Sequence, residues 1–173
     1  ELWPRLEPGT RSFLASAEAV FRTHRDDPTF DLSGVAISYA KAVETELNAL
    51  LFPAIQRVVA KKPRHEREVR VRERILDLGG VVPHQTLGTI KHLLKHEPVV
   101  RGAVADALRH DSSWLLDILT RELDPILKLR NPGAHSEVTS ASELEVIRRT
   151  IIGVGREGLL DRIAHVRMRA ITT

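Results

Sequence analysis

Residues 33–60 read SGVAISYAKAVETELNALLFPAIQRVVA and carry the longest helical pattern in the chain. Apolar residues recur there in steps of three and four, which places them on one face of an α-helix. They are Ala36, Ala40, Val43, Leu47, Leu50, Leu51, Ala54 and Val58. Because proline lacks a backbone N–H and clashes with the preceding turn, Pro53 predicts a kink or a break. The stretch therefore predicts a long second helix, kinked or divided near its end.

Glu44 is the residue that does not fit this pattern. At about 100° per residue, it lies within roughly 60° of the centre of the apolar stripe. A carboxylate in that position is usually paired or lines a cleft. Two interpretations stay open, namely that Glu44 supports a functional arginine or that it forms an ordinary salt bridge. Tyr39, Glu46 and Asn48 lie further round the helix than Glu44.

Similar periodicity predicts further helices on both sides of this stretch. Their expected ranges are Thr10–Arg25, Thr86–His96, Pro98 to about His110, Ser112 or Ser113 to the region of Leu127, a segment from Ser140 through Ile152, and a last helix ending near Arg169. Thr10 is expected to cap the first of these helices, and Ser112 or Ser113 the one that begins there. Ser140 and Glu143 have the spacing of a capping box. For Arg67–Leu78 we predict a helix, although the alternation of Val69–Arg72 leaves a short strand as the alternative. The fold class is therefore an all-α bundle.

The size of the chain, 173 residues, suits one domain that spans 1–173. Residues 1–9 contain two prolines and a glycine and form a leading segment. The chain begins with Glu1 and its single methionine is Met168, so we expect a domain excised from a larger protein. No cysteine is present and no apolar run approaches a membrane-spanning length. We expect a cytoplasmic protein without membrane contact.

The positive charge of the chain is concentrated in residues 61–74, KKPRHEREVRVRER. Seven Lys or Arg and three Glu give this segment +4, whereas the whole chain carries +3. A local basic patch is typical of proteins that bind polyanions. We therefore predict that RNA contacts Lys61, Lys62, Arg64 and Arg67, together with Lys128. The alternative is a solvated helix that carries Glu–Arg pairs.

Residues 129–135, LRNPGAH, hold the candidate catalytic residues Arg130, Asn131 and His135. Arginine is permanently charged and its planar fork suits a phosphate. Histidine takes and gives protons near neutral pH, and the asparagine amide can orient a partner. When RNA is cleaved by its own 2′-hydroxyl, that hydroxyl must lose a proton, the leaving oxygen must gain one, and the negative charge of the phosphorane must be stabilised. None of these steps requires a metal. The alternative is that Arg130 and His135 are unrelated surface residues.

The spacing of this motif sets a geometrical condition. Five residues turn an ideal helix by about 500°, which leaves Arg130 and His135 about 140° apart. Pro132 and Gly133 favour a distorted turn that could bring the two side chains together. Alternatively, two copies of the motif face each other across a two-fold axis.

The motif resembles that of the HEPN superfamily of helical RNA-processing proteins, with an arginine, a polar residue and a histidine after an apolar helix. The stretch Ser38–Leu51 also looks like the long second helix of such domains, and Leu87–Ile90 looks like the start of a later one. The resemblance covers about residues 33–152. It implies an up-and-down bundle with a long kinked second helix and additional peripheral helices.

The resemblance also implies a function. It would make the chain a metal-independent endoribonuclease that leaves a 2′,3′-cyclic phosphate. The enzyme would be a homodimer with a composite active site in which Arg130 and His135 are catalytic and Asn131 orients groups. Such domains occur in toxin and antiviral defence systems, so an antitoxin or a sensor domain is an expected partner. A non-catalytic helical module that dimerises, or binds nucleotides or a partner protein, is the alternative.

Metal ligation is not expected from the sequence, and neither is a cofactor. His92 and His96 are four residues apart with Glu97 nearby, but their order is not that of a zinc-protease motif and no third ligand is evident.

Overall fold

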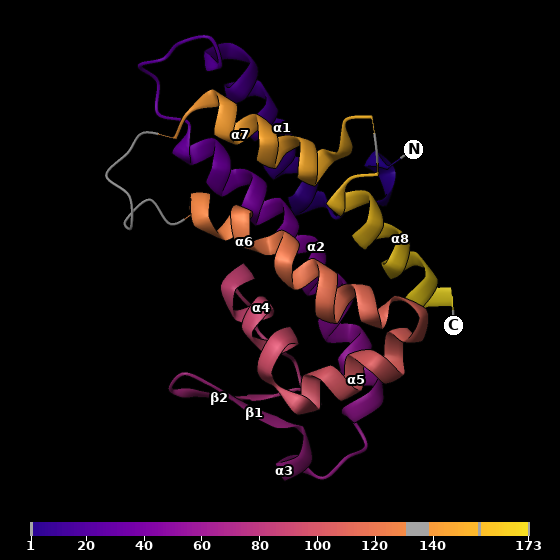
Figure 1. The fold of residues 1–173 in the computed structure, drawn as a ribbon. Coiled ribbons are helices and arrows are strands. Elements are labelled where there is room, and N and C mark those ends of the chain that lie inside the picture. The colour runs from indigo at the N-terminus through magenta and orange to yellow at the C-terminus, as the bar shows by residue number, and fades with distance from the viewer. Residues whose placement is uncertain (1, 131–138, 156, 173) are drawn as a thin grey trace. The chain divides into compact units, whose positions relative to one another are not determined.

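Helix α2 (Ser33–Val59) has the bounds that its apolar stripe predicts, within one residue. Our computed structural model describes residues 2–130, 139–155 and 157–172 of the chain. Within these residues α2 is the longest helix, with 27 residues, and it continues through Pro53 without a break. The proline side chain is exposed, so its ring lies on the outer surface of the helix. Figure 1 shows α2 as the long purple helix.

The chain divides into two compact units, which share no simple sequence boundary. The first comprises Glu1–Glu46 and Asp124–His165, and the second comprises Leu47–Leu123 and Val166–Thr173. Helices α2, α6 (Leu119–Arg130) and α8 (Leu159–Thr172) each contribute residues to both units. The remaining elements each belong to one unit.

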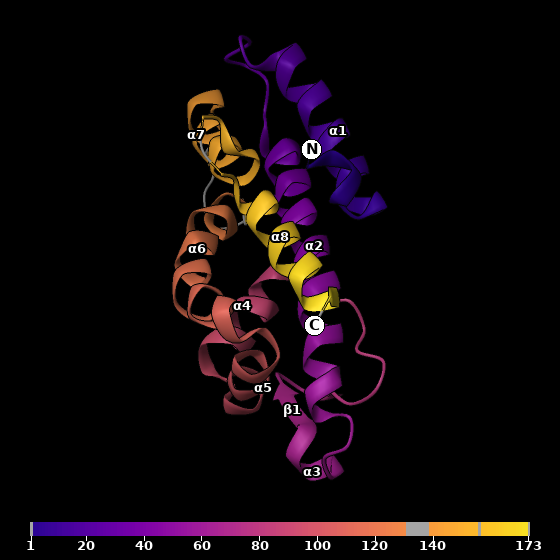
Figure 2. The same ribbon diagram turned by 90° about the vertical axis from the view of Figure 1, so that its right-hand side faces the viewer.

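In the first unit, η1 (Trp3–Arg5) and α1 (Pro8–His24) precede α2, and α7 (Ala141–Arg148) continues into the π-helical turn η5 (Arg149–Gly153). Helix α1, the first part of α2 and α7 lie side by side (Figures 1 and 2). Their facing residues exclude water almost completely, and such burial is the main stabilising contribution to a helical bundle. The buried set includes Leu14, Ala17, Phe21, Ala36, Tyr39, Val43, Leu144 and Ile147.

The second unit contains the later part of α2, the short helix α3 (Arg64–Arg67), strands β1 (Glu68–Val71) and β2 (Arg74–Asp77), and helices α4 (Leu87–His96) and α5 (Pro98–Leu108). The turns η2 (Arg109–Asp111) and η3 (Trp114–Ile118) lead into α6. Helix α4 buries four residues at helical spacing, namely Leu87, Ile90, Leu93 and Leu94. Thr86 accepts the N–H of Thr89 and caps this helix.

The helix predicted for Arg67–Leu78 is wrong, because this stretch forms an antiparallel hairpin. Val69 pairs with Leu76, and both are buried. The alternation that we noted for Val69–Arg72 was the correct signal, since buried and exposed residues alternate along a strand. Strand β1 follows α3 after the end of α2 (Figure 2).

Three further expectations at the residue level are corrected. The side chain of Thr10 does not cap α1, which begins at Pro8; its hydroxyl instead donates to the carbonyl of Ala42. The side chain of Ser113 makes no capping bond, and Ser112 donates to the carbonyl of Arg109. Tyr39 and Glu46, which were expected further round the helix than Glu44, are completely buried.

The described residues are mostly helical, which confirms the all-α class, and the hairpin is a small addition to it. None of the helices among these residues combines the length and the apolar character that crossing a membrane would require.

Candidate active site

The predicted catalytic motif begins at the end of α6. This helix buries Leu123 and Ile126 and exposes Lys128, so one of its faces packs into the protein. Arg130 is the last residue of α6. Asn131 and His135 lie in the range 131–138, outside the described residues. The roles of these three residues therefore stay predictions.

The other side of the motif is a capped helix. The N–H of Glu143 donates to the Ser140 hydroxyl over 3.3 Å, and the Ser140 N–H donates to the Glu143 carboxylate over 3.2 Å. This reciprocal pair confirms the predicted capping box and fixes the start of α7. Thr139, which precedes Ser140, is buried.

Asp31 connects the start of α2 to this flank of the motif. Its carboxylate accepts the hydroxyl and the N–H of Ser33, over 2.8 and 3.0 Å. These two bonds, together with one from the backbone of Thr139, lower the pKa of the Asp31 carboxyl. Thr139, which lies just before α7, is thereby bound to Asp31, which lies just before α2.

Glu44 is paired, as its position on α2 predicts. Its side chain is 0 % exposed, and one carboxylate oxygen lies 2.6 Å from Nζ of Lys41, whose side chain is 36 % exposed. A buried carboxylate requires such a partner because desolvation of an isolated charge is costly. Lys41 lies on the same helix, three residues before Glu44. Support of Arg130 by Glu44 remains a prediction.

A second polar cluster, which is partly buried, was not predicted from the sequence. The phenol of Tyr39 donates to Glu18 over 2.5 Å, and Arg148 donates to both oxygens of Glu18 over 2.7 and 2.9 Å. The cluster joins α1, α2 and α7. A signal for it was present, because Tyr39 lies three residues after Ala36 and four before Val43, on the apolar stripe.

The electrostatics of this cluster favour one protonation state. Burial raises the pKa of the Glu18 carboxyl, but the hydrogen bonds from Arg148 and Tyr39 outweigh it and leave the pKa lowered. Burial and the bond to Glu18 raise the pKa of Tyr39. The cluster is therefore held as a carboxylate between a guanidinium and a neutral phenol.

The basic segment forms α3 and the hairpin, in the second unit. Lys61, Lys62 and Arg64 are exposed, and Arg64 pairs with Glu68. Arg67 instead has an internal role: its guanidinium donates to the carbonyl of Ala60 over 2.8 Å and pairs with the Asp77 carboxylate at 2.9 Å. This pairing weakens the prediction that Arg67 contacts RNA.

Three arginines that we did not select lie at the tip of the hairpin. Arg70, Arg72 and Arg74 are all exposed. Arg72 has a φ of 55°, which places it in the left-handed region at the turn between the strands. These three residues, which we call the hairpin arginines, add to the exposed positive charge of the basic segment.

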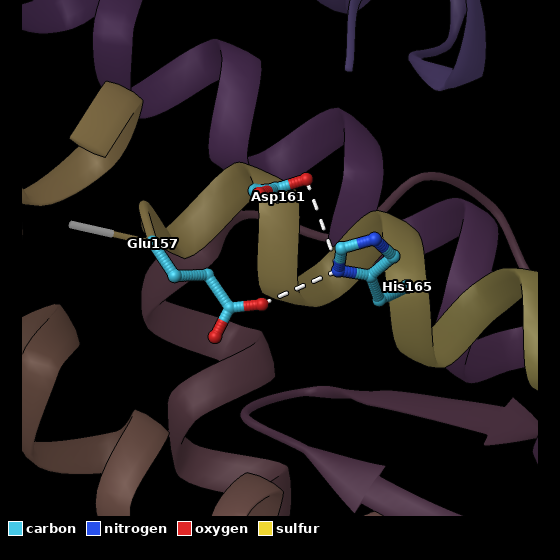
Figure 3. A group of neighbouring side chains, drawn as sticks. All are labelled: Glu157, Asp161 and His165. Atoms are coloured by element: carbon cyan, nitrogen blue, oxygen red, sulfur yellow. Dashed lines mark hydrogen bonds and ion pairs between the residues drawn. The ribbon is translucent and has the colours of Figure 1, made fainter. Parts of the chain in front are cut away.

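Two other features could hold a ligand. A groove of about 810 Å³ in the second unit is lined by Arg57, residues 106–111 and the end of α8, and it contains none of the predicted site residues. Among the described residues, the group with three converging metal-ligand side chains is Glu157, Asp161 and His165 (Figure 3). His92 and His96 have ring centres 5.2 Å apart.

Comparison of the chain with protein-family models, with curated proteins and with solved structures gave no match.

Proposed function

We propose that the chain is a metal-independent RNA endonuclease of the HEPN type. The observation that carries the proposal is the sequence Arg130-Asn131 followed by His135, set between the amphipathic helix α6 and the capped helix α7. A permanent cation, an amide and a titratable imidazole are thereby supplied within six residues. Strong N-terminal capping of α7 supports a defined position for the chain after the motif.

The reaction follows from these side chains. His135 removes the proton from the 2′-hydroxyl, whose oxygen then attacks the adjacent phosphorus. Arg130 offsets the negative charge that develops on the phosphorane, and Asn131 orients the reacting groups. The bond from phosphorus to the 5′-oxygen breaks, that oxygen takes up a proton, and a 2′,3′-cyclic phosphate remains. A second motif from a partner copy would provide the additional acid or base.

The buried carboxylate of Glu44 supports the proposal indirectly. A carboxylate that is 0 % exposed on α2 is an expensive group to keep in a helical core. Its retention is explained if Glu44 also orients the Arg130 guanidinium. The exposed hairpin arginines supply positive charge that suits an RNA backbone.

The test is cleavage of structured RNA by the purified protein with a chelator present. We expect cleavage by the wild type and a loss of at least 100-fold in His135→Ala, in line with removal of a general acid or base. His110→Ala, which changes an exposed histidine in the other unit, should retain full activity. Mass spectrometry should find the cyclic phosphate. Equal background cleavage by wild type and His135→Ala would overturn the proposal.

The same assay tests Glu44. We expect Glu44→Gln to cut more slowly while circular dichroism shows an intact fold. Full activity in a folded Glu44→Gln protein would remove Glu44 from the site and leave Arg130 and His135 untouched as candidates.

A further inference from the structure

Three side chains with metal-ligand atoms converge at the start of α8. Glu157, Asp161 and His165 are spaced by four residues, so the two helical members lie on one face of α8, one turn apart. Nδ1 of His165 lies 3.3 Å from Oε1 of Glu157 and 3.8 Å from Oδ1 of Asp161. Figure 3 shows the imidazole nitrogen directed at both carboxylates. All three ligand atoms lie within 4.8 Å of one another.

The distances fit a shared cation better than two strong ion pairs. Charge-assisted hydrogen bonds between nitrogen and carboxylate are about 2.7–2.9 Å long, which is shorter than either separation. Ligands at about 2.0–2.2 Å from a tetrahedral zinc ion are about 3.4 Å apart. The separations of 3.3 and 3.8 Å lie close to that value. A central ion therefore requires only small movements of side chains.

The donor set selects the class of ion. Two carboxylates and one neutral imidazole carry a charge of about −2, which a divalent cation neutralises. Oxygen-only sites suit Ca²⁺ and Mg²⁺, whereas an imidazole nitrogen favours a borderline transition ion such as Zn²⁺. The side chains of Glu157, Asp161 and His165 are 50, 31 and 39 % exposed. An ion can therefore enter from solvent and keep water in its remaining coordination positions.

We propose that Glu157, Asp161 and His165 form a binding site for one divalent transition-metal ion, with Zn²⁺ as the reference ion. The bound ion would join residue 157, which precedes α8, to the first two turns of that helix. The site is independent of the proposed RNA cleavage, which uses no metal. Its role is structural, since binding stabilises the folded start of α8.

The experiment must separate this site from the two histidines of α4. His92 and His96 are also four residues apart and could bind Zn²⁺ weakly. The starting protein is therefore the His92→Ala/His96→Ala variant, titrated with zinc chloride by calorimetry. The changes His165→Ala and Asp161→Asn are then introduced separately into this starting protein. Asp106→Asn is the control, because it changes an exposed carboxylate elsewhere in the chain. Circular dichroism confirms the fold of each variant.

We expect the starting variant and the Asp106→Asn control to bind one equivalent of Zn²⁺. The His165→Ala and Asp161→Asn changes should each weaken binding at least tenfold. Co²⁺ should give visible absorption bands that disappear with His165→Ala. The proposal is overturned if the starting variant binds no zinc, or if folded His165→Ala and Asp161→Asn proteins bind it as tightly as the control.

Discussion

Glu18 shows how a single side chain can connect several helices of the first unit. Its carboxylate accepts hydrogen bonds from α2 and α7 and so ties three helices through one side chain. Arg22 lies 3.3 Å from the same carboxylate, and the guanidinium of Arg148 also lies over the ring of Phe21. A bidentate arginine gives such a cluster geometrical specificity as well as energy.

Tyr39 provides a direct test, because it is the single tyrosine of the chain. Its pKa is raised by burial and by its bond to Glu18. A group whose pKa is raised in the folded state stabilises that state below its ordinary pKa, near ~10, and this stabilisation is lost as pH rises further. We expect no tyrosinate absorbance near pH 10 while the protein remains folded, followed by ionisation together with unfolding.

The control for this titration is Tyr39→Phe. It keeps the ring but removes the hydroxyl, and we expect a loss of about 1–3 kcal/mol in the free energy of unfolding because Glu18 loses one donor. The variant should also lose the part of the alkaline destabilisation that comes from the phenol. Full ionisation of the folded wild type at pH 10 would contradict the assignment.

The environment of some single residues could be predicted from the sequence, and that of others could not. Pairing of Glu44 followed from its place on an apolar face, and the ion pair with Lys41 confirms it. The burial of Tyr39 was not predicted, because only apolar residues were counted in the stripe. A tyrosine can also be buried there when its hydroxyl has a hydrogen-bond acceptor. The partners Glu18 and Arg148 are 130 residues apart, so no local pattern joins them.

Among the elements, α7 is the one whose start is best defined by sequence. A serine and a glutamate three residues apart satisfy two backbone N–H groups that would otherwise lack partners at the start of the helix. The helix has only eight residues before η5, so its first turn is a large share of its length. Its stability therefore depends on the cap.

We expect Ser140→Ala to reduce the free energy of unfolding by about 1 kcal/mol, the usual cost of losing an N-cap side chain. Chemical denaturation of the purified protein measures this. Ser16→Ala is the matched control, since Ser16 is an exposed residue inside α1 and alanine is the better helix former there. An equal loss in both variants would show that the cap contributes nothing specific.

The hairpin is the secondary-structure element that the sequence pattern predicted incorrectly. Val71, Ile75 and Leu78 have helical spacing, yet the buried partners are Val69 and Leu76, which face each other across the strands. The turn gave no warning, because Arg72 adopts the left-handed conformation that glycine or asparagine usually marks. Long helices were predicted well since their periodic signal extends over several turns.

For the whole molecule, the main asymmetry is that of charge. The segment 61–74 carries +4 in a chain of net charge +3, and the structure presents part of it as the exposed hairpin arginines. Arg64 pairs with Glu68 of the same segment, and Arg67 pairs with Asp77, which lies just beyond it. The division into two units, in contrast, had no sequence signal, because α2, α6 and α8 cross it without a linker.

We expect the triple change of Arg70, Arg72 and Arg74 to Gln to weaken RNA binding and to lower the slope of log affinity against log salt by up to about three. Fluorescence anisotropy at several salt concentrations measures both quantities. The control changes Arg25, Lys95 and Arg121 to Gln. These three residues are also exposed, and their replacement removes the same amount of positive charge. Equal losses in the two variants would mean that net charge alone attracts RNA.

The hairpin has a consequence for the behaviour of the protein at high concentration. Its sheet has only two strands, so among the described residues each strand has an outer edge of unpaired backbone groups. Such edges recruit strands from other copies and start aggregation, and Ile75 adds an apolar side chain that is 66 % exposed. The neighbouring arginines act as gatekeepers, because like charges on approaching copies repel each other. Removing the hairpin arginines should therefore make the protein less soluble as well as weaker in binding RNA.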